Sequence, residues 1–534
     1  MTAPVYVVQG DFAVGDIKGN RNKLIDASHA AKRAGAEVVI APELALSGYP
    51  PEDLLFDGDF IAALSDAVAV ICAKAEPSVA LLFGAPNAEG GVITNAAILV
   101  RGGKTEGIYA KAHLPNTSVF DDKRYFVAGD GIPLVFSAGG ETYAVQVCED
   151  IWHPQQADKV RKSGAKNTLA LNGSPFDINK HRRRLSAAAD FARTSQTTVF
   201  YCNTVGGQDE LIFDGASFVV NDEGKVVCQM AAFAEAQGLI REYHHQYPAC
   251  EDAMVYDALV MAVRDYAKKT GIGAAVLGLS GGVDSALVAT IAADALGAEN
   301  ITAVMMPSPH TSAESIDDAA KIAENLGCDY MTMPITPMMA AAEQTLAQHL
   351  TPRAEDVTME NVQARLRGML LMALANNRGG LLLATGNKSE AACGYATLYG
   401  DMCGGFAPLK DASKTRVWRL AKYRNKQGEV IPPRVISRAP SAELKPGQKD
   451  EDSLPPYDVV DSIVAAHLAE GKRLPPMREK FDADALSAVL TMMTKSEHKR
   501  RQAAMGPKLT ECAFGRDRRM PVANRFTILG DGDD

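Results

Sequence analysis

The chain has 534 residues, which suggests about three or four domains, or two large ones. Its 55 Lys and Arg residues against 65 Asp and Glu residues give a formal net charge of −10. This charge excludes a whole-molecule positive field that would hold nucleic acid or an anionic membrane. With 47% hydrophobic and 22% charged residues, the composition is typical of a globular protein and excludes collagen, coiled coil and disorder.

The sequence carries no recognisable export or membrane signal. Its first residues lack the basic region, apolar stretch and cleavage site of a signal peptide. No apolar run reaches the roughly 20 residues needed to cross a bilayer. The 9 cysteines are scattered and include no C-x-x-C pair, which argues against a disulfide framework and a zinc cage. We therefore expect a cytoplasmic protein with free thiols, and neither a membrane nor nucleic acid as partner.

In the first half, short apolar runs rich in β-branched residues alternate with helical stretches, which predicts an α/β sandwich. The predicted strands are 5–8, 38–40, 79–83, 143–147, 168–171 and 198–201, and the predicted helices are 20–34 and 179–194. The run 217–229, with its Asn-Asp-Glu-Gly turn, predicts a hairpin that ends this half. A polar stretch without periodicity, 242–248, follows it. We place the boundary there, with a first domain at 1–245.

The second domain, 252–534, begins with a predicted amphipathic helix over 252–269. The elements predicted after it are strands 275–279, 302–306 and 381–385 and helices 286–296 and 316–326. Strands that alternate with helices indicate a doubly wound parallel sheet. From residue 439 onward the chain is rich in proline and charge and then helical. Neither half is strongly basic.

The most specific motif is S-G-G-V-D-S at 280–285, between a predicted strand and an Ala-rich helix. Ligands of parallel sheets bind at this edge. Gly281 and Gly282 let the backbone approach an anion closely, while the serines and the first N–H groups of the helix donate toward it. No G-K-[S/T] closes the loop, and Gly271-Ile-Gly273 lacks the third glycine of a dinucleotide fingerprint. The loop therefore indicates adenylation with pyrophosphate release, with a helix-capping turn as the alternative.

The loop resembles the signature of the N-type ATP pyrophosphatases, and further motifs resemble the NAD synthetases over nearly all of 252–527. These motifs begin at Met306, Asn361, Ala384, Tyr399, Pro408, Lys499 and Gly515. The resemblance implies that ATP adenylates the carboxylate of nicotinic acid adenine dinucleotide (deamido-NAD), releasing pyrophosphate, and that ammonia then displaces AMP.

The same resemblance implies a set of site residues. The ATP contacts would be Gly278, Leu279, Ser280, Gly281, Gly282, Val283, Asp284, Ser285, Thr385 and Lys414. The deamido-NAD contacts would be Asn361, Glu390 and Lys508. Magnesium is expected because polyphosphate chemistry needs a bridging cation, and Asp284 and Glu390 would hold it.

The first half contains a candidate nucleophile, Cys148, at the end of the predicted strand 143–147. A free cysteine is more often a buried apolar residue. However, Glu43 and Lys111 follow apolar stretches in the same way, so the three side chains could converge at one sheet edge. A thiol that attacks an amide needs a base and a cation for the oxyanion, which Glu43 and Lys111 would supply. His153 is the rival base, but a histidine before a proline at a helix entry is more often a capping residue.

The trio resembles the nitrilase, or carbon–nitrogen hydrolase, superfamily over roughly 3–240. Both halves together resemble the glutamine-dependent NAD synthetases. The resemblance implies that Cys148 forms a thioester with glutamine and that the released ammonia serves the second half. It implies glutamine contacts at Thr117, Ser174 and Lys180, although Thr117 stands where the family usually has tyrosine. It also implies a dimer-based homo-oligomer.

Other interpretations stay open from the sequence. The pyrophosphate loop could serve adenylation of another carboxylate or carbonyl, such as that of a nucleotide base. The chain could instead be a regulatory protein that binds glutamine or a dinucleotide without catalysis. The basic clusters 499–501 and 516–519 suit dinucleotide phosphates or a solvated helix face better than nucleic acid. The run 181–184 is predicted to be a solvated face.

Overall fold

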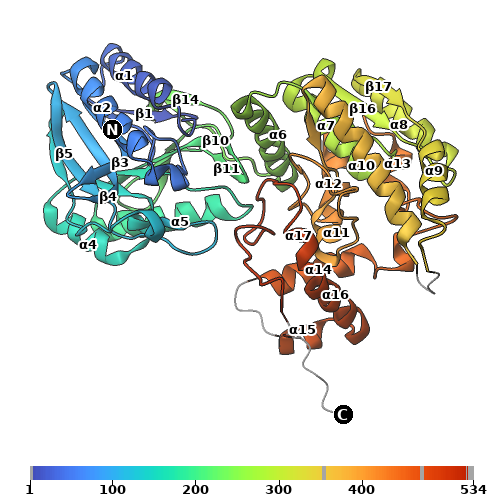
Figure 1. Ribbon diagram of the computed structural model, residues 1–534. Coiled ribbons are helices and arrows are strands. Elements are labelled where there is room, and N and C mark those ends of the chain that lie inside the picture. The colour runs from blue at the N-terminus through green and yellow to red at the C-terminus, as the bar shows by residue number, and fades with distance from the viewer. Residues whose placement is uncertain (1–3, 352–355, 470–473, 525, 527–534) are drawn as a thin grey trace. The chain divides into compact units, whose positions relative to one another are not determined.

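The computed structural model describes residues 4–351, 356–469, 474–524 and 526. The chain separates into two compact units, Met1–Ala249 and Cys250–Asp534 (Figure 1). Within the described residues, no helix is both long and apolar enough to span a bilayer.

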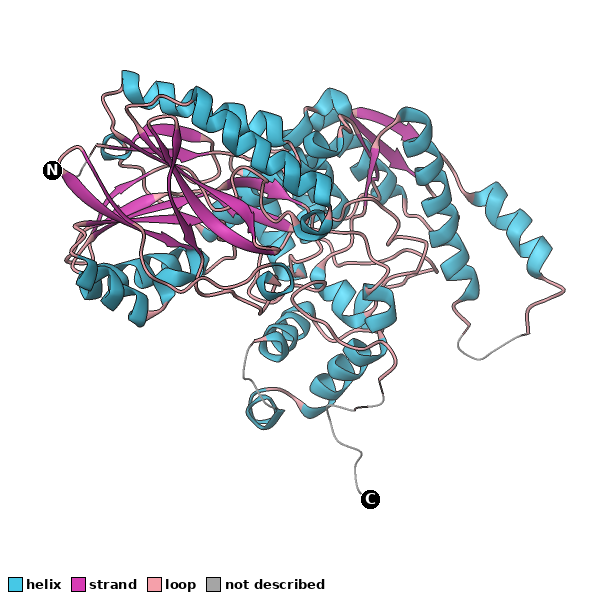
Figure 2. Ribbon diagram, turned by 60° about the vertical axis from the view of Figure 1, so that its left-hand side comes forward, coloured by secondary structure: helices cyan, strands magenta, loops and turns pink. Residues whose placement is uncertain are grey.

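The first unit contains two six-stranded sheets, as the predicted α/β sandwich requires (Figure 2). One sheet has the order β14-β1-β2-β3-β4-β5, with strands Ala236–Leu239, Val5–Gln9, Val38–Ile40, Ala80–Glu89, Val92–Arg101 and Lys104–Ala110. The other has the order β13-β12-β9-β8-β7-β6, with strands Val226–Gln229, Phe218–Val220, Thr198–Asn203, Asn167–Asn172, Glu141–Val147 and Val135–Ala138. The fold class predicted from the sequence is confirmed for this unit.

The two sheets share a core of apolar side chains, among them Val7, Ile40, Val145, Leu169 and Phe200. Their outer faces are covered by helices, which is why the central strands are buried on both sides and read as continuous apolar runs. On the first sheet these are α1 (Ile17–Arg33) and α2 (Gly58–Lys74). On the second they are α4 (Pro154–Ser163) and α5 (Lys180–Ser195).

The topology brings several strand ends to one edge of each sheet. The strands β1, β2 and β3 are parallel, and β4 and β5 follow as antiparallel neighbours, so β2 and β5 run in the same direction. In the second sheet β7, β8 and β9 are parallel. Glu43 follows β2, Lys111 follows β5, and Cys148 follows β7. The long β4–β5 hairpin and helix α2 had no counterpart among the predicted elements.

The second unit is built on a parallel sheet of order β17-β16-β15-β18, which confirms the predicted doubly wound fold. Its strands are Asp329–Thr332, Ile301–Met305, Ala275–Gly278 and Leu381–Leu383. Its principal helices are α6 (Glu251–Thr270), α7 (Val283–Leu296), α8 (Ala313–Leu326), α9 (Thr336–Leu346), α10 (Thr358–Arg378), α11 (Lys388–Cys393), α12 (Lys414–Asn425) and α13 (Pro433–Ser437). The remaining helices are α14 (Tyr457–Leu468), α15 (Leu474–Lys480), α16 (Ala483–Lys495) and α17 (Glu497–Arg500). The helices α14 and α16 pack around their own apolar cluster.

Two predictions about the first unit are wrong in detail. The hairpin at 217–229 exists as β12 and β13, but it does not end the unit, because β14 follows and pairs antiparallel with β1. The run 181–184 is only partly a solvated face: Arg182 is exposed and Arg183 is half-buried, whereas the other two residues are buried. His181 and Arg184 are buried at the start of α5, where His181 stacks on Tyr247 with ring centroids 3.8 Å apart and Arg184 pairs with Asp214. The charge pattern of one helix could not reveal these partners.

The buried imidazole of His181 predicts a pH dependence. Burial lowers its pKa from the usual 6.5 to about 4, so the unfolded chain binds a proton that the folded chain does not. Stability contributed by the neutral ring is therefore lost as pH falls from 6.5 toward 4, by about 2.5 kcal/mol at pH 4.5. We expect His181→Phe, which keeps a stacking ring, to lose less stability than the wild type between pH 7 and 4.5. Thermal unfolding of the two proteins at both pH values measures this, and equal losses would contradict the assignment.

Candidate active sites

Cys148 lies at a sharp turn between β7 and the 3-10 helix η2 (Cys148–Trp152). Its φ angle is 48°, a conformation that costs a non-glycine residue roughly 1–3 kcal/mol. Backbone strain of this kind is common where a nucleophile stands at a sheet edge. Burial, with the charge of Glu43 next, raises the pKa of the Cys148 thiol well above its usual value. The resting side chain is therefore a thiol, and an attack on a substrate needs a base.

Lys111 lies between two carboxylates, and all three side chains are buried. Its Nζ donates to Glu43 Oε1 at 2.8 Å and to Asp122 Oδ2 at 2.7 Å. Burial opposes the charge on Lys111, but the two carboxylates outweigh it and raise its pKa, so the side chain stays a cation. The charge of Cys148 also acts on Lys111. The structure thus brings the three residues predicted to be catalytic into one electrostatic cluster, and adds Asp122, which the sequence analysis did not assign.

Glu43 is held in place on both of its oxygens. Besides Lys111, Oε1 accepts a hydrogen bond from Asn95 Nδ2 at 2.7 Å, and Oε2 accepts one from the backbone N–H of Gly173 at 2.8 Å. The chain after β2 also passes directly over Gly84 of β3. A Cβ at this glycine would lie 2.2 Å from the backbone nitrogen of Leu44, so only glycine permits this path. The carboxylate therefore has a fixed position and keeps lone pairs that can accept a further proton.

Asp150 joins the Cys148 turn to the strand end that carries Lys111. Its buried carboxylate accepts hydrogen bonds from Tyr109 Oη at 2.8 Å, from the His113 backbone N–H at 2.9 Å and from the Val147 backbone N–H at 3.3 Å. His113 Nδ1 lies 3.0 Å from the same carboxylate. These donors come from both sides of the site. Asp150 therefore fixes the distance between the nucleophile and the predicted oxyanion cation.

The predicted glutamine contacts lie in different surroundings. Ser174 is buried, and its Oγ accepts a hydrogen bond from Arg184 Nε at 3.0 Å. Lys180 lies with Nζ 5.1 Å from the Trp152 ring centroid. Burial, followed by repulsion from Arg184, lowers the pKa of Lys180, whereas Cys148 opposes this shift. Thr117 is exposed in a turn, where its carbonyl accepts from the Phe120 N–H. Arg184 therefore interacts with both Ser174 and Lys180, and Cys148 interacts with Lys180. The contact described for Thr117 involves neither Arg184 nor Cys148.

His153, the rival base, stacks on His113 with ring centroids 3.7 Å apart. Burial, and then the charge of His113, lowers its pKa below the usual value. His153 is the N-cap residue of α4, as expected for a histidine before proline, but its side chain makes no capping hydrogen bond. Its Nε2 lies 3.7 Å from Glu149 Oε1. None of these contacts involves Cys148, whereas Glu43 acts directly on the charge of Cys148.

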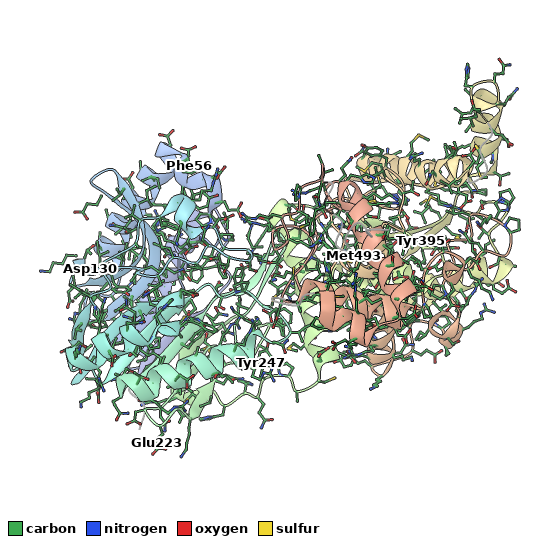
Figure 3. The ribbon with its side chains drawn as sticks, turned by 90° about the horizontal axis from the view of Figure 1, so that it is seen from below. Phe56, Asp130, Glu223, Tyr247, Tyr395 and Met493 are labelled. Atoms are coloured by element: carbon green, nitrogen blue, oxygen red, sulfur yellow. The ribbon has the colours of Figure 1, made fainter. Side chains whose placement is uncertain are left out.

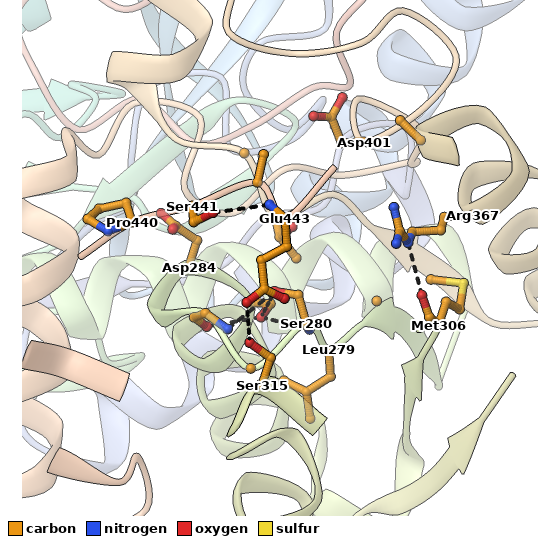
Figure 4. A pocket seen from close by; sticks show the side chains of 18 of the residues that line it. Leu279, Ser280, Asp284, Met306, Ser315, Arg367, Asp401, Pro440, Ser441 and Glu443 are labelled. Atoms are coloured by element: carbon orange, nitrogen blue, oxygen red, sulfur yellow. Dashed lines mark hydrogen bonds between the residues drawn. The ribbon is translucent and has the colours of Figure 1, made fainter. Parts of the chain in front are cut away.

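The second unit contains a cavity of about 310 Å³ at the carboxyl edge of its parallel sheet (Figure 4). The predicted ATP residues that line it are Gly278, Leu279, Ser280, Gly281, Gly282, Val283, Asp284, Ser285, Thr385 and Lys414. Glu390 lines it as well. The loop is closed on itself by a hydrogen bond from the Ser280 N–H to Ser285 Oγ at 3.2 Å. Gly281 has a φ of 82°, and a Cβ there would lie 2.3 Å from the Ser315 carbonyl oxygen, so this position requires glycine.

A second buried lysine lies between two carboxylates in this cavity. Lys414 Nζ donates to Asp284 Oδ2 at 2.5 Å and to Glu390 Oε1 at 3.2 Å. Burial opposes the charge of Lys414, but Asp284 and Glu390 raise its pKa. Burial also raises the pKa of Glu390 to about 7, against the opposing effect of Lys414. The cavity therefore holds a permanent cation beside a carboxyl group that titrates near neutral pH.

Among the described residues, no group of three or more His, Cys, Asp or Glu side chains could hold a metal ion by itself. Magnesium, however, is commonly bound by one or two carboxylates together with substrate phosphates. Asp284 and Glu390 both line the cavity and approach the same atom, Lys414 Nζ. These two carboxylates fit a magnesium ion that arrives with a polyphosphate.

Two predicted dinucleotide contacts do not line the cavity. Asn361 Oδ1 accepts from Thr397 Oγ1 at 2.8 Å, and the buried Lys508 pairs with Asp517 and donates to the Glu511 carbonyl at 2.9 Å. The cavity adds Arg367, Asp401, Ser441 and Glu443, which the sequence analysis did not assign. Arg367 and Asp401 belong to the motifs that begin at Asn361 and Tyr399. These motifs could therefore have indicated both residues as part of the site.

Basic side chains of the cluster 499–501 contact other residues of the same unit. Lys499 Nζ donates to the carbonyls of Gly394 and Ala396, each at 2.7 Å. Arg500 is buried and pairs with Glu497 at 2.8 Å. Arg518 Nη1, from the second cluster, also reaches Glu497 at 3.2 Å. These contacts engage Lys499, Arg500 and Arg518 inside the unit.

Comparison with known proteins follows the two units. Residues 5–241 match the carbon–nitrogen hydrolase family, and residues 255–503 match the NAD synthase family. The glutamine-dependent NAD(+) synthetase of Xanthomonas campestris is 44% identical over 98% of both chains. That of Acinetobacter baylyi is 42% identical over 96% of both chains. The solved structure of the Acinetobacter baumannii glutamine-dependent NAD+ synthetase with ADP is 39% identical, covers 97% of this chain and 98% of its own, and gives a TM-score of 0.78.

The role of Asp150 in holding the turn can be tested by Asp150→Asn. The amide places a donor where the carboxylate accepts from backbone N–H groups, which we expect to cost about 2 kcal/mol locally. Amide hydrogen exchange at residues 112, 113 and 147 should then become at least tenfold faster. Asp130→Asn is the matched control, because the exposed carboxylate of Asp130 accepts a hydrogen bond from the Ile132 N–H at 2.8 Å, away from the Cys148 turn. Unchanged exchange in the Asp150 variant would show that the carboxylate is not needed there.

Proposed function

The chain belongs to the family of glutamine-dependent NAD(+) synthetases, and on this premise we propose how its residues divide the reaction between the two units. The family's enzymes are ATP-dependent ligases, which removes the alternative of a binding protein without catalysis. One observation carries the assignment of residues. Each unit holds a buried lysine between two carboxylates, beside Cys148 in the first unit and beside the S-G-G-V-D-S loop in the second.

In the first unit, Cys148 Sγ attacks the side-chain amide carbon of glutamine. Glu43 accepts the thiol proton during the attack, which is required because burial keeps the resting thiol protonated. The charge that develops on the amide oxygen is stabilised by Lys111, whose ammonium group is already desolvated and fixed. Glu43 then passes the proton to the leaving nitrogen, so that ammonia departs and a thioester between Cys148 and the glutamyl group remains.

Water completes this half-reaction. Glu43 takes a proton from a water molecule that attacks the thioester carbon, and Lys111 again stabilises the oxyanion. The carbon–sulfur bond breaks, Cys148 regains its proton, and glutamate is released. Ser174 and Lys180 orient the glutamine. Ser174 is held by a hydrogen bond from Arg184, and the charge of Lys180 interacts with Cys148. Thr117 is retained as a glutamine contact from the family resemblance alone.

In the second unit, the loop backbone and the start of α7 bind the ATP phosphates, and Thr385 borders the same cavity. The carboxylate of deamido-NAD attacks the α-phosphorus, pyrophosphate leaves, and ammonia then displaces AMP to give NAD. Lys414 balances the negative charge that grows on the phosphates, since it is a buried cation that lines the cavity. Asn361, Glu390 and Lys508 are proposed to contact the dinucleotide.

Magnesium is part of the proposal, with Asp284 and Glu390 as its protein ligands. When bound, the ion would screen the charge of the phosphates and orient them for displacement. Both carboxylates also pair with Lys414. Lys414, which contacts both proposed metal ligands, would be placed to pair with phosphate oxygens of ATP as well.

The proposal extends to assembly and location. A dimer-based homo-oligomer is supported by exposed apolar side chains on α10, where Met369 is 54% and Met372 is 39% exposed. A cytoplasmic location is proposed because ATP and glutamine, the substrates of this family, are abundant there.

The division of labour predicts the behaviour of Cys148→Ala. With glutamine as nitrogen donor, NAD formation should fall by at least about a thousandfold, because no nucleophile remains. With ammonium it should stay within about twofold of wild type. Cys228→Ala is the matched control, since Cys228 is a buried cysteine of the same unit with the same 5% exposure as Cys148. Loss of both activities would refute the division, and unchanged glutamine use would remove Cys148 as nucleophile.

The loop assignment predicts the behaviour of Asp284→Ala. We expect NAD formation to fall at least about a hundredfold with either nitrogen donor, because a proposed metal ligand and a partner of Lys414 are lost together. Asp294→Ala, at the other end of α7, removes a carboxylate that pairs with Arg424 at 2.7 Å and should leave the rate nearly unchanged. Rates are measured with saturating ATP, magnesium and deamido-NAD. A wild-type rate for Asp284→Ala would refute the assignment.

A further inference from the structure

Arg184 is a buried cation of the first unit that the proposed mechanism does not use. Its side chain is 1% exposed. Nε donates to Ser174 Oγ at 3.0 Å, and Nη2 donates to the carbonyls of Ser174 and Pro175 at 2.6 and 2.9 Å. Nη1 donates to Asp214 Oδ1 at 2.6 Å. A buried guanidinium is tolerated only with such complete pairing, so this arrangement fixes both the backbone and the hydroxyl of Ser174.

The pairing also determines what Ser174 can offer a ligand. A guanidinium has only donors, so Ser174 Oγ must act as acceptor toward Arg184. The backbone N–H of Ser174 is already bound to Asn203 Oδ1 at 3.0 Å. Arg184 therefore does not take the hydroxyl proton of Ser174. This proton can be donated to the neighbouring buried Tyr201 hydroxyl or to an acceptor of the substrate, such as a carbonyl or carboxylate oxygen of glutamine.

Asp214 connects this arrangement to the end of the unit. Its second oxygen accepts a hydrogen bond from Tyr247 Oη at 2.7 Å. The Tyr247 ring is held against His181 of α5, with an interplanar angle of 5°. Tyr247 is labelled in Figure 3. Tyr247 lies two residues before Ala249, where the first unit ends. The segment that leads into the second unit is thus linked to Ser174 through Asp214 and Arg184.

We propose that Arg184 is a positioning residue that sets the affinity for glutamine by holding Ser174. We also propose that the position of Arg184 depends, through Asp214, on Tyr247 in the segment that leaves the first unit. The proposal rests on the assignment of Ser174 as a glutamine contact. A shift of the segment that withdraws the Tyr247 hydroxyl leaves one oxygen of a buried carboxylate unpaired. Asp214 and Arg184 must then adjust, and Ser174 moves with them. The affinity for glutamine therefore depends on the position of the segment around Tyr247, which leads into the second unit.

The test uses Tyr247→Phe in the full chain, which removes the hydroxyl and keeps the ring on His181. We expect the KM for glutamine to rise about fivefold or more, with kcat at saturating glutamine and ammonia-driven NAD formation within about twofold of wild type. Tyr243→Phe is the matched control, because it removes one hydroxyl of the same segment that donates to the Gln237 carbonyl at 3.0 Å. Its KM should stay at the wild-type value.

A double-mutant cycle separates positioning from general stability. In a Ser174→Ala background, Tyr247→Phe should change the KM for glutamine by less than twofold, because the hydroxyl through which it acts is gone. Arg184→Lys, which keeps the charge and loses the forked donors, should raise the KM in the wild-type background. A wild-type KM for Tyr247→Phe, or an undiminished effect in the Ser174→Ala background, would overturn this inference. Failure of this inference leaves the proposed function intact as long as Cys148→Ala abolishes glutamine-driven NAD formation and keeps ammonia-driven formation.

Discussion

The structure of the first unit depends on one buried charge. Lys111 cannot leave its ammonium group unpaired in an apolar interior, so the chain must bring carboxylates to it. It does so with Glu43, which follows β2, and with Asp122, the first residue of the short helix α3 (Asp122–Tyr125). Because Glu43 is 68 residues from Lys111 in the sequence, this ion pair sets how the ends of β2 and β5 meet. The same requirement would preorganise the proposed site, since the cation that pairs with both carboxylates also interacts with Cys148, the proposed nucleophile.

The second unit repeats the arrangement with a different purpose. Lys414 also lies between two carboxylates, but its cluster lines an open cavity, whereas Lys111 is fully enclosed. An enclosed cluster keeps its partners through a reaction cycle, which suits a fixed oxyanion site. A cluster beside a cavity can exchange carboxylates for phosphate oxygens, which suits a substrate that arrives with several negative charges. Under the proposed mechanism, enclosure therefore distinguishes Lys111, which keeps its partners, from Lys414, whose partners change.

The sequence predicted the parts of both sites that follow strands, because parallel strands end at one edge and place successive loops together. This reasoning predicts Glu43, Lys111, Cys148 and the S-G-G-V-D-S loop as site residues. It does not predict Asp122, Asn95 and Asp150, because nothing local distinguishes a buried carboxylate or amide from an exposed one. The run 181–184 was misjudged for the same reason. Its burial depends on Asp214 and Tyr247, 30 residues or more further along the chain.

The burial of Cys148 has a chemical consequence beyond catalysis. Peroxides and disulfides react with the thiolate form of cysteine, and their attack also requires access. A thiol that is 5% exposed and held in its protonated form offers neither. Burial thus protects Cys148, the proposed nucleophile, from oxidants, and we expect an exposed cysteine such as Cys250 to be oxidised first.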